Sequence, residues 1–473
     1  MLRKLRIALA SLAFAAVLLL FLYPWDGEAA RLGFIARWQF WPALLAGNLL
    51  IVGVLVLITL LFGRIYCSVL CPLGILQDIV SRLSSLRKGK KMRFTPSKEK
   101  KWLRLGVWAL FIAAMIAGVQ TLVAILEPYS AFGRIIATAS GKFITIATAV
   151  IAGATLCIVA VLSWKHGRTW CNTICPVGTT LSFFSRFSVF RPVIDSSKCK
   201  SCHMCERKCK AACIDISNKN SIDYSRCVDC FDCLDSCKFG ALKYKVRDFG
   251  NKNVILDESE KSTQSQGRRA FLSAGAMVLG AATLEAQSKK VDGGLAAIEG
   301  KKKPERTVPL TPFGSQSVKD FYKKCTACQL CVSVCPNQVL RPSTDLEHLM
   351  QPEMSYEKGY CRQECTDCSQ ICPTGAILPI SPAEKTQIHI GKASVNRSLC
   401  VVEADGVSCG NCARHCPVGA IMMVPLNPDD PDGLKIPAVD ESLCIGCGAC
   451  EYLCPSRPFS AITVNGLHVH IKD

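Results

Sequence analysis

The sequence predicts two kinds of structure in one chain: an α-helical membrane bundle of four spans, followed by small α+β domains organised by cysteine side chains. Three observations lead to this prediction. Mean hydropathy is +0.26 although 20% of the residues are charged, so part of the chain is unsuited to water. Four long uncharged stretches fill the first third, and most of the 30 cysteines follow at short, regular spacings. A chain of 473 residues with this pattern is not a small secreted disulfide scaffold.

Each uncharged stretch is long enough to cross a hydrocarbon core of about 30 Å as a helix. The stretches are Ile7–Trp25, Phe40–Gly63, Leu105–Leu126 and Phe143–Trp164. Basic residues predict their orientation, because Lys and Arg accumulate in cytoplasmic loops. Segment 64–104 holds eleven Lys or Arg against two acids. We therefore expect a multi-pass protein of the inner membrane, with this segment, the N-terminus and the chain after Trp164 on the cytoplasmic side.

The two halves of this region repeat each other at an offset of 104 residues without gaps. Gly63–Gly74 and Gly167–Gly178 share the motif Gly-Arg-x2-Cys-x3-Cys-Pro-x-Gly. A repeat of this length predicts two helix pairs related by a pseudo-two-fold axis. A spacing of four places both thiols of a motif on one helical face, with the proline ending that segment. The thiols expected to meet are those of Cys67, Cys71, Cys171 and Cys175. They are candidates for an extra metal cluster or a redox-active thiol site, and small packing residues are the alternative.

Two cysteine groups after the fourth stretch have the spacing Cys-x2-Cys-x2-Cys-x3-Cys, which is typical of [4Fe–4S] clusters. In two-cluster domains the fourth cysteine of each group binds the other cluster. This rule assigns Cys199, Cys202, Cys205 and Cys237 to one cluster, and Cys227, Cys230, Cys233 and Cys209 to the other. Cys209 lacks a following proline, and Cys213 lies four residues further on, so either thiol is a candidate ligand. Zinc sites usually separate two Cys-x2-Cys pairs by a longer spacer.

Four more groups occupy the C-terminal part, and in each the fourth cysteine precedes a proline. The groups are Cys325, Cys328, Cys331 and Cys335; Cys361, Cys365, Cys368 and Cys372; Cys400, Cys409, Cys412 and Cys416; and Cys444, Cys447, Cys450 and Cys454. They predict four more [4Fe–4S] clusters, which makes six in all. The paired Cys-x3-Cys motifs are the candidate site of a seventh cluster. Neighbouring groups are expected to exchange their fourth ligands, and pairing of the first group with the fourth is the alternative.

A polar segment without cysteines separates the two sets of groups. It contains Arg268 and Arg269, followed by Phe-Leu and an uncharged stretch to Leu284. This pattern is typical of a twin-arginine export signal. It predicts that the following clusters lie in the periplasm and that segment 268–286 is a short fifth anchor or is cleaved. An interfacial helix with a chance arginine pair is the alternative.

The predicted domains follow from these features. They are a four-helix membrane domain (1–190), a two-cluster ferredoxin-like domain (191–250), a linker with the internal signal (251–324) and a four-cluster ferredoxin-type domain (325–473).

The first half of the chain, to about residue 250, resembles the NapH-type membrane quinol dehydrogenase component. The resemblance rests on the four stretches, both Cys-x3-Cys-Pro motifs and the trailing two-cluster domain. Residues 265–473 resemble the NapG/MauM ferredoxin-type protein in the export signal, the Pro312–Gly314 stretch and the order of the four groups. The chain thus resembles a fusion of two subunits. The missing proline after Cys209, the extra Cys213 and the altered spacing in the second C-terminal group depart from the pattern.

The resemblance implies oxidation of membrane quinol and transfer of electrons to a periplasmic reductase of a nitrate-reductase-like system, or to a cytochrome. No molybdopterin, haem or nucleotide motif is recognised, so we expect the terminal chemistry on a partner, and whether this chain is itself an enzyme stays open. A quinol site needs a proton acceptor near the membrane. Glu127, at the outer end of the third stretch, is the candidate catalytic residue, and a solvated interfacial acid is the alternative.

Two other functions compete with this interpretation. A FixG-like maturation factor for metallo-oxidases shares the membrane motifs and a ferredoxin, but it normally ends in a β-sandwich. A cytoplasmic-facing ferredoxin reductase would leave the arginine pair inert. The formal charge of +19 does not point to nucleic acid, because six clusters at about −2 each lower it to about +7. Much of the remaining basic excess orients the membrane domain.

Overall fold

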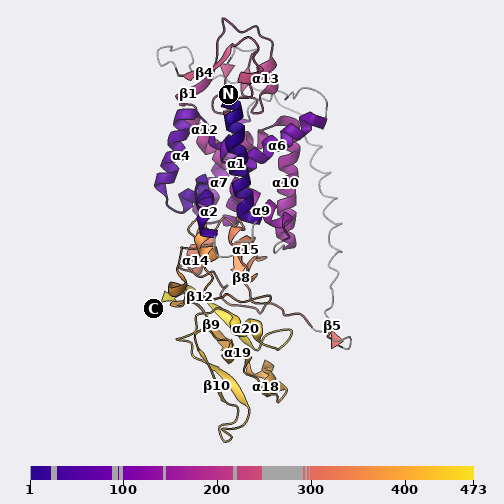
Figure 1. Ribbon diagram of the computed structural model, residues 1–473, viewed down its shortest axis with the longest axis vertical. Helices are drawn as coiled ribbons and strands as arrows, with labels where there is room; N and C mark the ends of the chain where they lie inside the picture. Colours follow the sequence, from indigo (N-terminus) through magenta and orange to yellow (C-terminus); the bar gives the residue numbers. More distant parts are fainter. Residues whose placement is uncertain are drawn as a thin grey trace.

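A computed structural model describes residues 2–22, 29–87, 94, 100–141, 145–216, 221–247, 291–292, 296–297 and 299–473. Within the described part, a helical bundle lies in the middle of an elongated molecule, with a cysteine-rich domain at each end (Figure 1). We call residues 190–247 module 1 and residues 299–473 module 2. Module 1 lies at the end of the bundle that carries the N-terminus, and module 2 lies at the opposite end. The expected export signal and anchor (268–286) lie outside the described residues.

The bundle is built from short and long helices in two similar halves. The first half contains α1 (Leu2–Leu22), α2 (Ala29–Arg37), α3 (Phe40–Leu45), α4 (Leu49–Phe62), α5 (Tyr66–Val69) and α6 (Pro72–Arg87). The second contains α7 (Lys101–Ala117), α8 (Gln120–Leu126), α9 (Pro128–Ala139), α10 (Ile146–His166), α11 (Thr169–Thr173) and α12 (Pro176–Ser185). The succession α4–α5–α6 returns as α10–α11–α12, as the 104-residue repeat predicts.

Each Cys-x3-Cys-Pro motif lies across a helix boundary, which differs from the predicted single helical face. The short helices α5 and α11 end before Cys71 and Cys175, and the prolines begin the next helices, α6 and α12. Proline suits the first position of a helix, because its missing N–H has no partner there in any case. The prolines therefore start a helix, where the sequence suggested that they end one.

Two of the four predicted spans are interrupted. The helices α1 and α10 are long and apolar enough to cross a membrane, while α4 is shorter and α8 and α9 form a pair bent by 80°. Gly47, with φ of +69°, separates α3 from α4 within the second predicted stretch. Gly118, with φ of +78°, ends α7 within the third. Left-handed glycines commonly terminate helices, so apolar composition alone overestimated their continuity.

Module 1 is a small α+β unit whose longest sheet pairs its first and last strands. Strand β1 (Phe190–Ile194) runs antiparallel to β4 (Leu242–Val246). Between them lie α13 (Met204–Lys208), β2 (Ile214–Asp215), β3 (Ser221–Ile222) and the 3-10 turn η1 (Leu234–Ser236). An acid on α6 attaches the module to the bundle, because Asp78 forms ion pairs with Arg6, Arg168 and Lys210.

Module 2 consists of short helices and two-stranded antiparallel sheets. Its longest sheet pairs β9 (Ile388–Val395) with β12 (Ile462–Lys472). The other elements are α14 (Val318–Lys324), α15 (Leu330–Val334), β7 (Leu340–Pro342), β8 (Pro352–Met354), α16 (Asp367–Ile371), α17 (Pro382–Lys385), η3 (Arg397–Leu399), α18 (Val401–Ala404), α19 (Asn411–Arg414), β10 (Ile421–Pro425), β11 (Lys435–Val439) and α20 (Ala449–Leu453), with β5 (Val291–Asp292) and β6 (Ala296–Ala297) before them.

Hydrogen bonds from side chains to backbone carbonyls, together with apolar contacts, join module 2 to the bundle. The Arg37 guanidinium donates to the Gln370 carbonyl at 2.8 Å, and the Gln120 amide donates to the Lys323 carbonyl at 2.5 Å. Leu330 and Ile371 of module 2 belong to the same buried apolar cluster as the bundle helices. The remainder of module 2 has a core of its own.

Candidate functional site

Module 1 gathers its cysteines into two sets, each of which lines a separate cavity. Cys199, Cys202, Cys205 and Cys237 line one cavity. Cys209, Cys213, Cys227, Cys230 and Cys233 line the other. The fourth cysteine of each group thus lies with the other group, which is the exchange expected for a two-cluster domain.

Left-handed residues bend the chain around these cavities. In the first group Ser201 and His203 have φ of 45° and 55°, and in the second Asp229 and Phe231 have φ of 48° and 60°. Each group therefore has one such residue directly before and one directly after its second cysteine. Left-handed backbone is unfavourable for residues other than glycine, so its repetition indicates a loop shaped to surround a ligand.

Cys209 and Cys213 both face the second cavity. Their sulfur atoms lie 3.4 Å apart, and the Cys213 backbone N–H donates to the Cys209 sulfur at 3.4 Å. The hydrogen bond from the Cys213 thiol, with those from backbone N–H groups, lowers the pKa of Cys209 to about 7. Cys209 is therefore the better placed of the two to serve as a thiolate.

Module 2 contains four sets built in the same exchanged way between neighbouring groups. Three of them line cavities: Cys335 with Cys361, Cys365 and Cys368; Cys416 with Cys444, Cys447 and Cys450; and Cys454 with Cys400, Cys409 and Cys412. In the fourth set, Cys325, Cys328 and Cys331 lie near enough to Cys372 for their charges to interact. The geometry corresponds to the exchange of fourth cysteines between neighbouring groups, and not to pairing of the first group with the fourth.

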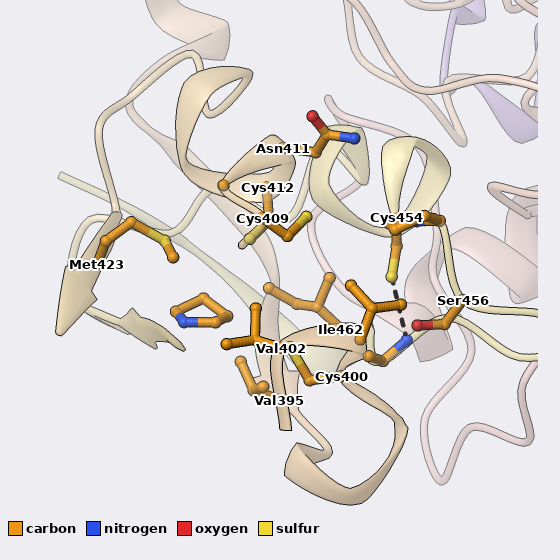
Figure 2. Close-up of a pocket in the computed structure, with 15 residues that line it drawn as sticks. Val395, Cys400, Val402, Cys409, Asn411, Cys412, Met423, Cys454, Ser456 and Ile462 are labelled. Carbon is orange, nitrogen blue, oxygen red and sulfur yellow. Dashed lines mark hydrogen bonds between the residues drawn. The ribbon is translucent and has the colours of Figure 1, made fainter. Parts of the chain in front are cut away.

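The set formed by Cys400, Cys409, Cys412 and Cys454 lies at the end of module 2 that is farthest from the bundle (Figure 1). Figure 2 shows Cys409 and Cys412 on one side of its cavity and Cys454 across from them, with Val402 and Ile462 among the apolar side chains that line it. The Ala461 N–H donates to the Cys454 sulfur at 3.3 Å (Figure 2). Hydrogen bonds of this kind stabilise a thiolate and the charge of a cluster bound to it.

Within the described residues, no three His, Cys, Asp or Glu side chains close on the position of a single metal ion. A tetrahedral zinc site would require that arrangement. A cubane instead has its four iron atoms at separate corners, so its thiols surround a cavity. The cavities lined by four or five cysteines fit the cubane.

The bundle brings together the four thiols of the two Cys-x3-Cys-Pro motifs. Cys67, Cys71, Cys171 and Cys175 are each at most 3% exposed. Cys175 lies close enough to Cys67, Cys71 and Cys171 to interact with them electrostatically. The four-thiol set therefore contains cysteines from both halves of the repeat. Packing alone would not require four thiols at one point on a pseudo-two-fold axis. The set has the number and type of ligands that one cubane needs.

Two buried arginines, at equivalent positions of the repeat, lie beside the four-thiol set. The Arg168 guanidinium donates to the Cys67 carbonyl at 2.6 Å, and the Arg64 guanidinium donates to the Asn172 side chain at 2.8 Å. A Cβ atom on Gly74 would collide with the Cys67 carbonyl, and one on Gly178 would collide with the Cys171 carbonyl. The two glycines therefore allow each motif to fold tightly, and the arginines place positive charge beside the four thiols.

Neighbouring cysteine sets lie close together within each module. Within module 1 the charges of Cys205 and Cys233 interact, and the Asn172 amide donates to the Ala211 carbonyl beside the second set. Within module 2 the charges of Cys331 and Cys368 interact, and those of Cys412 and Cys450 do as well. The remaining neighbours in module 2 meet where the Cys361 N–H donates to the Cys447 carbonyl at 3.0 Å. The four-thiol set thus lies between the two modules.

Glu127 lies inside the protein at the bend between α8 and α9. It is 1% exposed, so the structure contradicts the alternative of a solvated interfacial acid. Its carboxylate caps α9 by accepting a hydrogen bond from the Ser130 N–H. Its charge acts on Tyr66, beside the four-thiol set, and on Cys328 of module 2. Glu127 therefore occupies the region between these two sets, and its proton-accepting role stays a prediction.

Sequence reasoning did not single out several residues of these sites. Arg64 and Arg168 were visible only as part of the repeat, three residues before the first cysteine of each motif. The Lys385 ammonium donates to the Cys361 sulfur at 3.1 Å, although 24 residues separate them. Arg134 is fully buried on α9, a helix that lies between the third and fourth predicted stretches. The repeat was the sequence signal that could have identified Arg64 and Arg168, and it gave no information on Lys385 or Arg134.

Three family models match the chain, and all describe iron–sulfur binding. A 4Fe-4S binding domain matches residues 44–91 and 147–194, which contain the two Cys-x3-Cys-Pro motifs. A 4Fe-4S dicluster domain matches residues 324–376 and 407–457. A second 4Fe-4S dicluster domain matches residues 223–339. These matches support several [4Fe–4S] clusters in both modules and in the bundle.

Curated relatives align with parts of the chain. The methylamine utilization ferredoxin-type protein MauM of Methylobacillus flagellatus is 33% identical over 168 residues, covering 34% of this chain and 70% of MauM. An uncharacterized protein of Methanocaldococcus jannaschii is 29% identical over 221 residues, covering 45% of this chain and 77% of that protein. The ferredoxin-type protein NapF of Escherichia coli is 29% identical over 162 residues, covering 34% of this chain and 87% of NapF.

Proposed function

The chain belongs to the family of ferredoxin-type proteins that includes MauM, and from this premise we propose that it oxidises membrane quinol and passes electrons to a periplasmic reductase or cytochrome. It is an iron–sulfur electron-transfer protein. The observation that carries the finer proposal is the placement of the cysteine sets, which lie in both end modules and in the bundle between them (Figure 1). A [4Fe–4S] cluster bound in such a set supplies one-electron transfer.

The thiols of each set would hold the cluster, and nearby cations would offset its charge. Lys385 donates to a sulfur of the Cys361 group, while Arg64 and Arg168 lie beside the four-thiol set. A positive charge near a cluster favours the reduced form, because reduction adds one negative charge. These side chains therefore raise the reduction potential of the clusters beside them.

A position across the inner membrane suits the outer surface of the bundle. Leu12 on α1 is 70% exposed and Leu50 on α4 is 76% exposed. Water-exposed leucines at this density are unfavourable, whereas lipid would cover them without cost. Because the two modules lie at opposite ends of the bundle, we place module 1 in the cytoplasm and module 2 in the periplasm. The basic loops predict the same orientation.

Glu127 supports quinol as the electron donor. Oxidation of a quinol releases two protons as well as two electrons, so the donor site needs a base within reach. Glu127 is a buried carboxylate between the four-thiol set and Cys328. It is suited to take one of these protons.

Iron analysis of the purified full-length protein tests the cluster assignment. We expect about 28 iron atoms per chain if all seven sets are filled, and about four fewer in the double variant Cys71→Ser/Cys175→Ser. Cys157→Ser is the matched control, because this exposed cysteine of α10 lies outside every set. Unchanged iron in the double variant would remove the bundle set from the proposal.

Quinol-dependent reduction tests the activity. Addition of decylubiquinol under anaerobic conditions should bleach the visible cluster absorption and produce the electron paramagnetic resonance signals of reduced clusters. Glu127→Gln should slow this reduction while the iron content stays constant. Reduction by dithionite but not by the quinol would contradict quinol as the donor and leave the iron–sulfur assignment intact.

A further inference from the structure

The bend between α8 and α9 buries polar side chains deep in apolar surroundings. Glu127, Tyr129 and Arg134 are each at most 1% exposed. The ring of Phe21, from α1, lies 6.1 Å from the ring of Tyr129, and Phe132 is fully buried beside them. Polar groups are rarely placed in such surroundings without hydrogen-bond partners.

Two of these side chains nevertheless have unused hydrogen-bond donors. The Tyr129 hydroxyl has no partner, and neither do Nε and Nη2 of Arg134. Nη1 of Arg134 donates to the Ala124 carbonyl at 2.7 Å, while the Glu127 carboxylate accepts from the Ser130 N–H. Unpaired N–H groups on a buried guanidinium are strongly unfavourable, so these donors indicate a bound group that supplies acceptor atoms.

The site lies directly beside a cysteine set of module 2. A Cβ atom on Gly133 would collide with the Cys328 carbonyl, which shows how closely α9 packs on that loop. Tyr129 and Arg134 are both near enough to Cys328 for their charges to interact. A molecule held by their free donors would therefore lie next to the cluster of the Cys325 group.

The charge balance of the site favours a neutral ligand. The Glu127 carboxylate and the Arg134 guanidinium act on each other, so their opposite charges largely cancel. A free phosphate or another small anion would be repelled by the carboxylate. A quinol or quinone head group is neutral, has oxygen acceptors for Arg134 and Tyr129, and is soluble in the apolar surroundings of α1 and α9.

We propose that Arg134 and Tyr129 bind the head group of a quinol at the bend between α8 and α9, beside Cys328. This inference rests on the proposed function and specifies its site. It places quinol binding at the end of the bundle that carries module 2, next to the first cysteine set of that module. Arg134 and Tyr129 are binding residues, and Glu127 lies within the same site.

Binding of a quinol analogue to the purified full-length protein tests this proposal without any turnover. The probe is 2-heptyl-4-hydroxyquinoline N-oxide, whose fluorescence is quenched when it enters a quinol site. We expect Tyr129→Phe to weaken its affinity about three- to tenfold, because one hydrogen bond is lost. Arg134→Gln should weaken it tenfold or more, because two charged donors are lost. Iron content is measured on every sample.

Arg37→Gln is the matched control, because Arg37 contacts module 2 at the same end of the bundle through the Gln370 carbonyl. The affinity of the Arg37→Gln variant for the probe should equal that of the unchanged protein. If Tyr129→Phe and Arg134→Gln keep full affinity and full iron content, the proposal is wrong, and Arg134 only offsets the charge of the neighbouring cluster. If the unchanged protein binds no probe and is not reduced by quinol, the proposed quinol oxidation fails as well.

Discussion

Cys209 and Cys213 show how one residue decides the make-up of a site. Five thiols line the second cavity of module 1, but a cubane takes four. Cys209 has the spacing expected from the sequence and receives backbone N–H donors, while Cys213 lies 3.4 Å away as a thiol partner. Sequence reasoning left the choice open, and the hydrogen-bond pattern favours Cys209.

We therefore predict different outcomes for the two serine variants. Cys209→Ser should lower the iron content by about four atoms per chain and remove one reduced-cluster signal. Cys213→Ser should keep the iron and change only the line shape or potential of that cluster, because it removes a hydrogen bond to a ligand. Iron analysis with electron paramagnetic resonance is the measurement. Loss of iron from Cys213→Ser alone would reverse the assignment.

His470 gives module 2 a sensitivity to acid. It lies on β12, where its Nε2 is 3.1 Å from the Thr311 hydroxyl, and burial lowers its pKa to about 4. An unfolded histidine binds a proton below about pH 6.5, so the unfolded state takes up more protons than the folded state between pH 6.5 and 4. Stability should therefore fall as the pH falls through this range, by about 3 kcal/mol in total.

The prediction is checked with the apparent unfolding midpoint at pH 7 and pH 5. His470→Gln should lose less stability than the unchanged protein over this interval, since glutamine does not titrate. His468→Gln is the control, because His468 is an exposed residue of the same strand. An equal loss in all three proteins would show that His470 does not carry the effect.

At the scale of elements, helix α6 fixes module 1 to the bundle through one side chain. Asp78 pairs with Arg6 of α1 at 2.8 Å, with Arg168 at 2.8 Å and with Lys210 of module 1 at 3.4 Å. The basic residues of this region were expected to orient the protein in the membrane. Two of them, Arg6 and Arg168, are also buried in these specific contacts, which hydropathy and charge counts do not reveal.

Removal of this carboxylate should loosen module 1. Asp78→Asn leaves the buried Arg6 and Arg168 without their shared carboxylate, while Lys210 keeps its pair with Asp232. Removing one partner of a buried ion pair typically costs about 3–5 kcal/mol. Hydrogen exchange should increase in residues 221–247, and the apparent unfolding midpoint should drop. Asp235→Asn serves as the comparison, because Asp235 forms an exposed pair with Arg3 that is worth less than about 1 kcal/mol. Similar effects of the two variants would argue against the role of Asp78.

At the scale of the whole molecule, the opposite placement of the modules predicts opposite sides of the membrane. Alkaline phosphatase, active only in the periplasm, should be inactive when fused after Arg247 and active when fused after Asp473. Arg268→Lys/Arg269→Lys should abolish the second activity if the arginine pair acts as the export signal. Fusions to green fluorescent protein should give the converse pattern. A cytoplasmic signal from both positions, with or without the substitutions, would contradict the exported model.

The sequence by itself determined the cysteine chemistry and the internal repeat. The spacing Cys-x2-Cys-x2-Cys-x3-Cys is local, so the loops that surround a cluster and the exchange of fourth cysteines follow from short-range geometry. The 104-residue repeat likewise predicted that Cys67, Cys71, Cys171 and Cys175 would meet. Both conclusions depend on residues that are near in sequence or related by an exact repeat.

Only the tertiary structure decided what lies between these sites. The breaks at Gly47 and Gly118 depend on backbone conformation within uniformly apolar stretches, so hydropathy could not locate them. Arg134 and Tyr129 meet Cys328 of module 2 across about 200 residues of chain, and no local pattern encodes that contact. Long-range packing places these polar groups inside the bundle, beside the first cysteine set of module 2, and this is why the sequence predicted the cysteine sets but not the arginine and the tyrosine beside them.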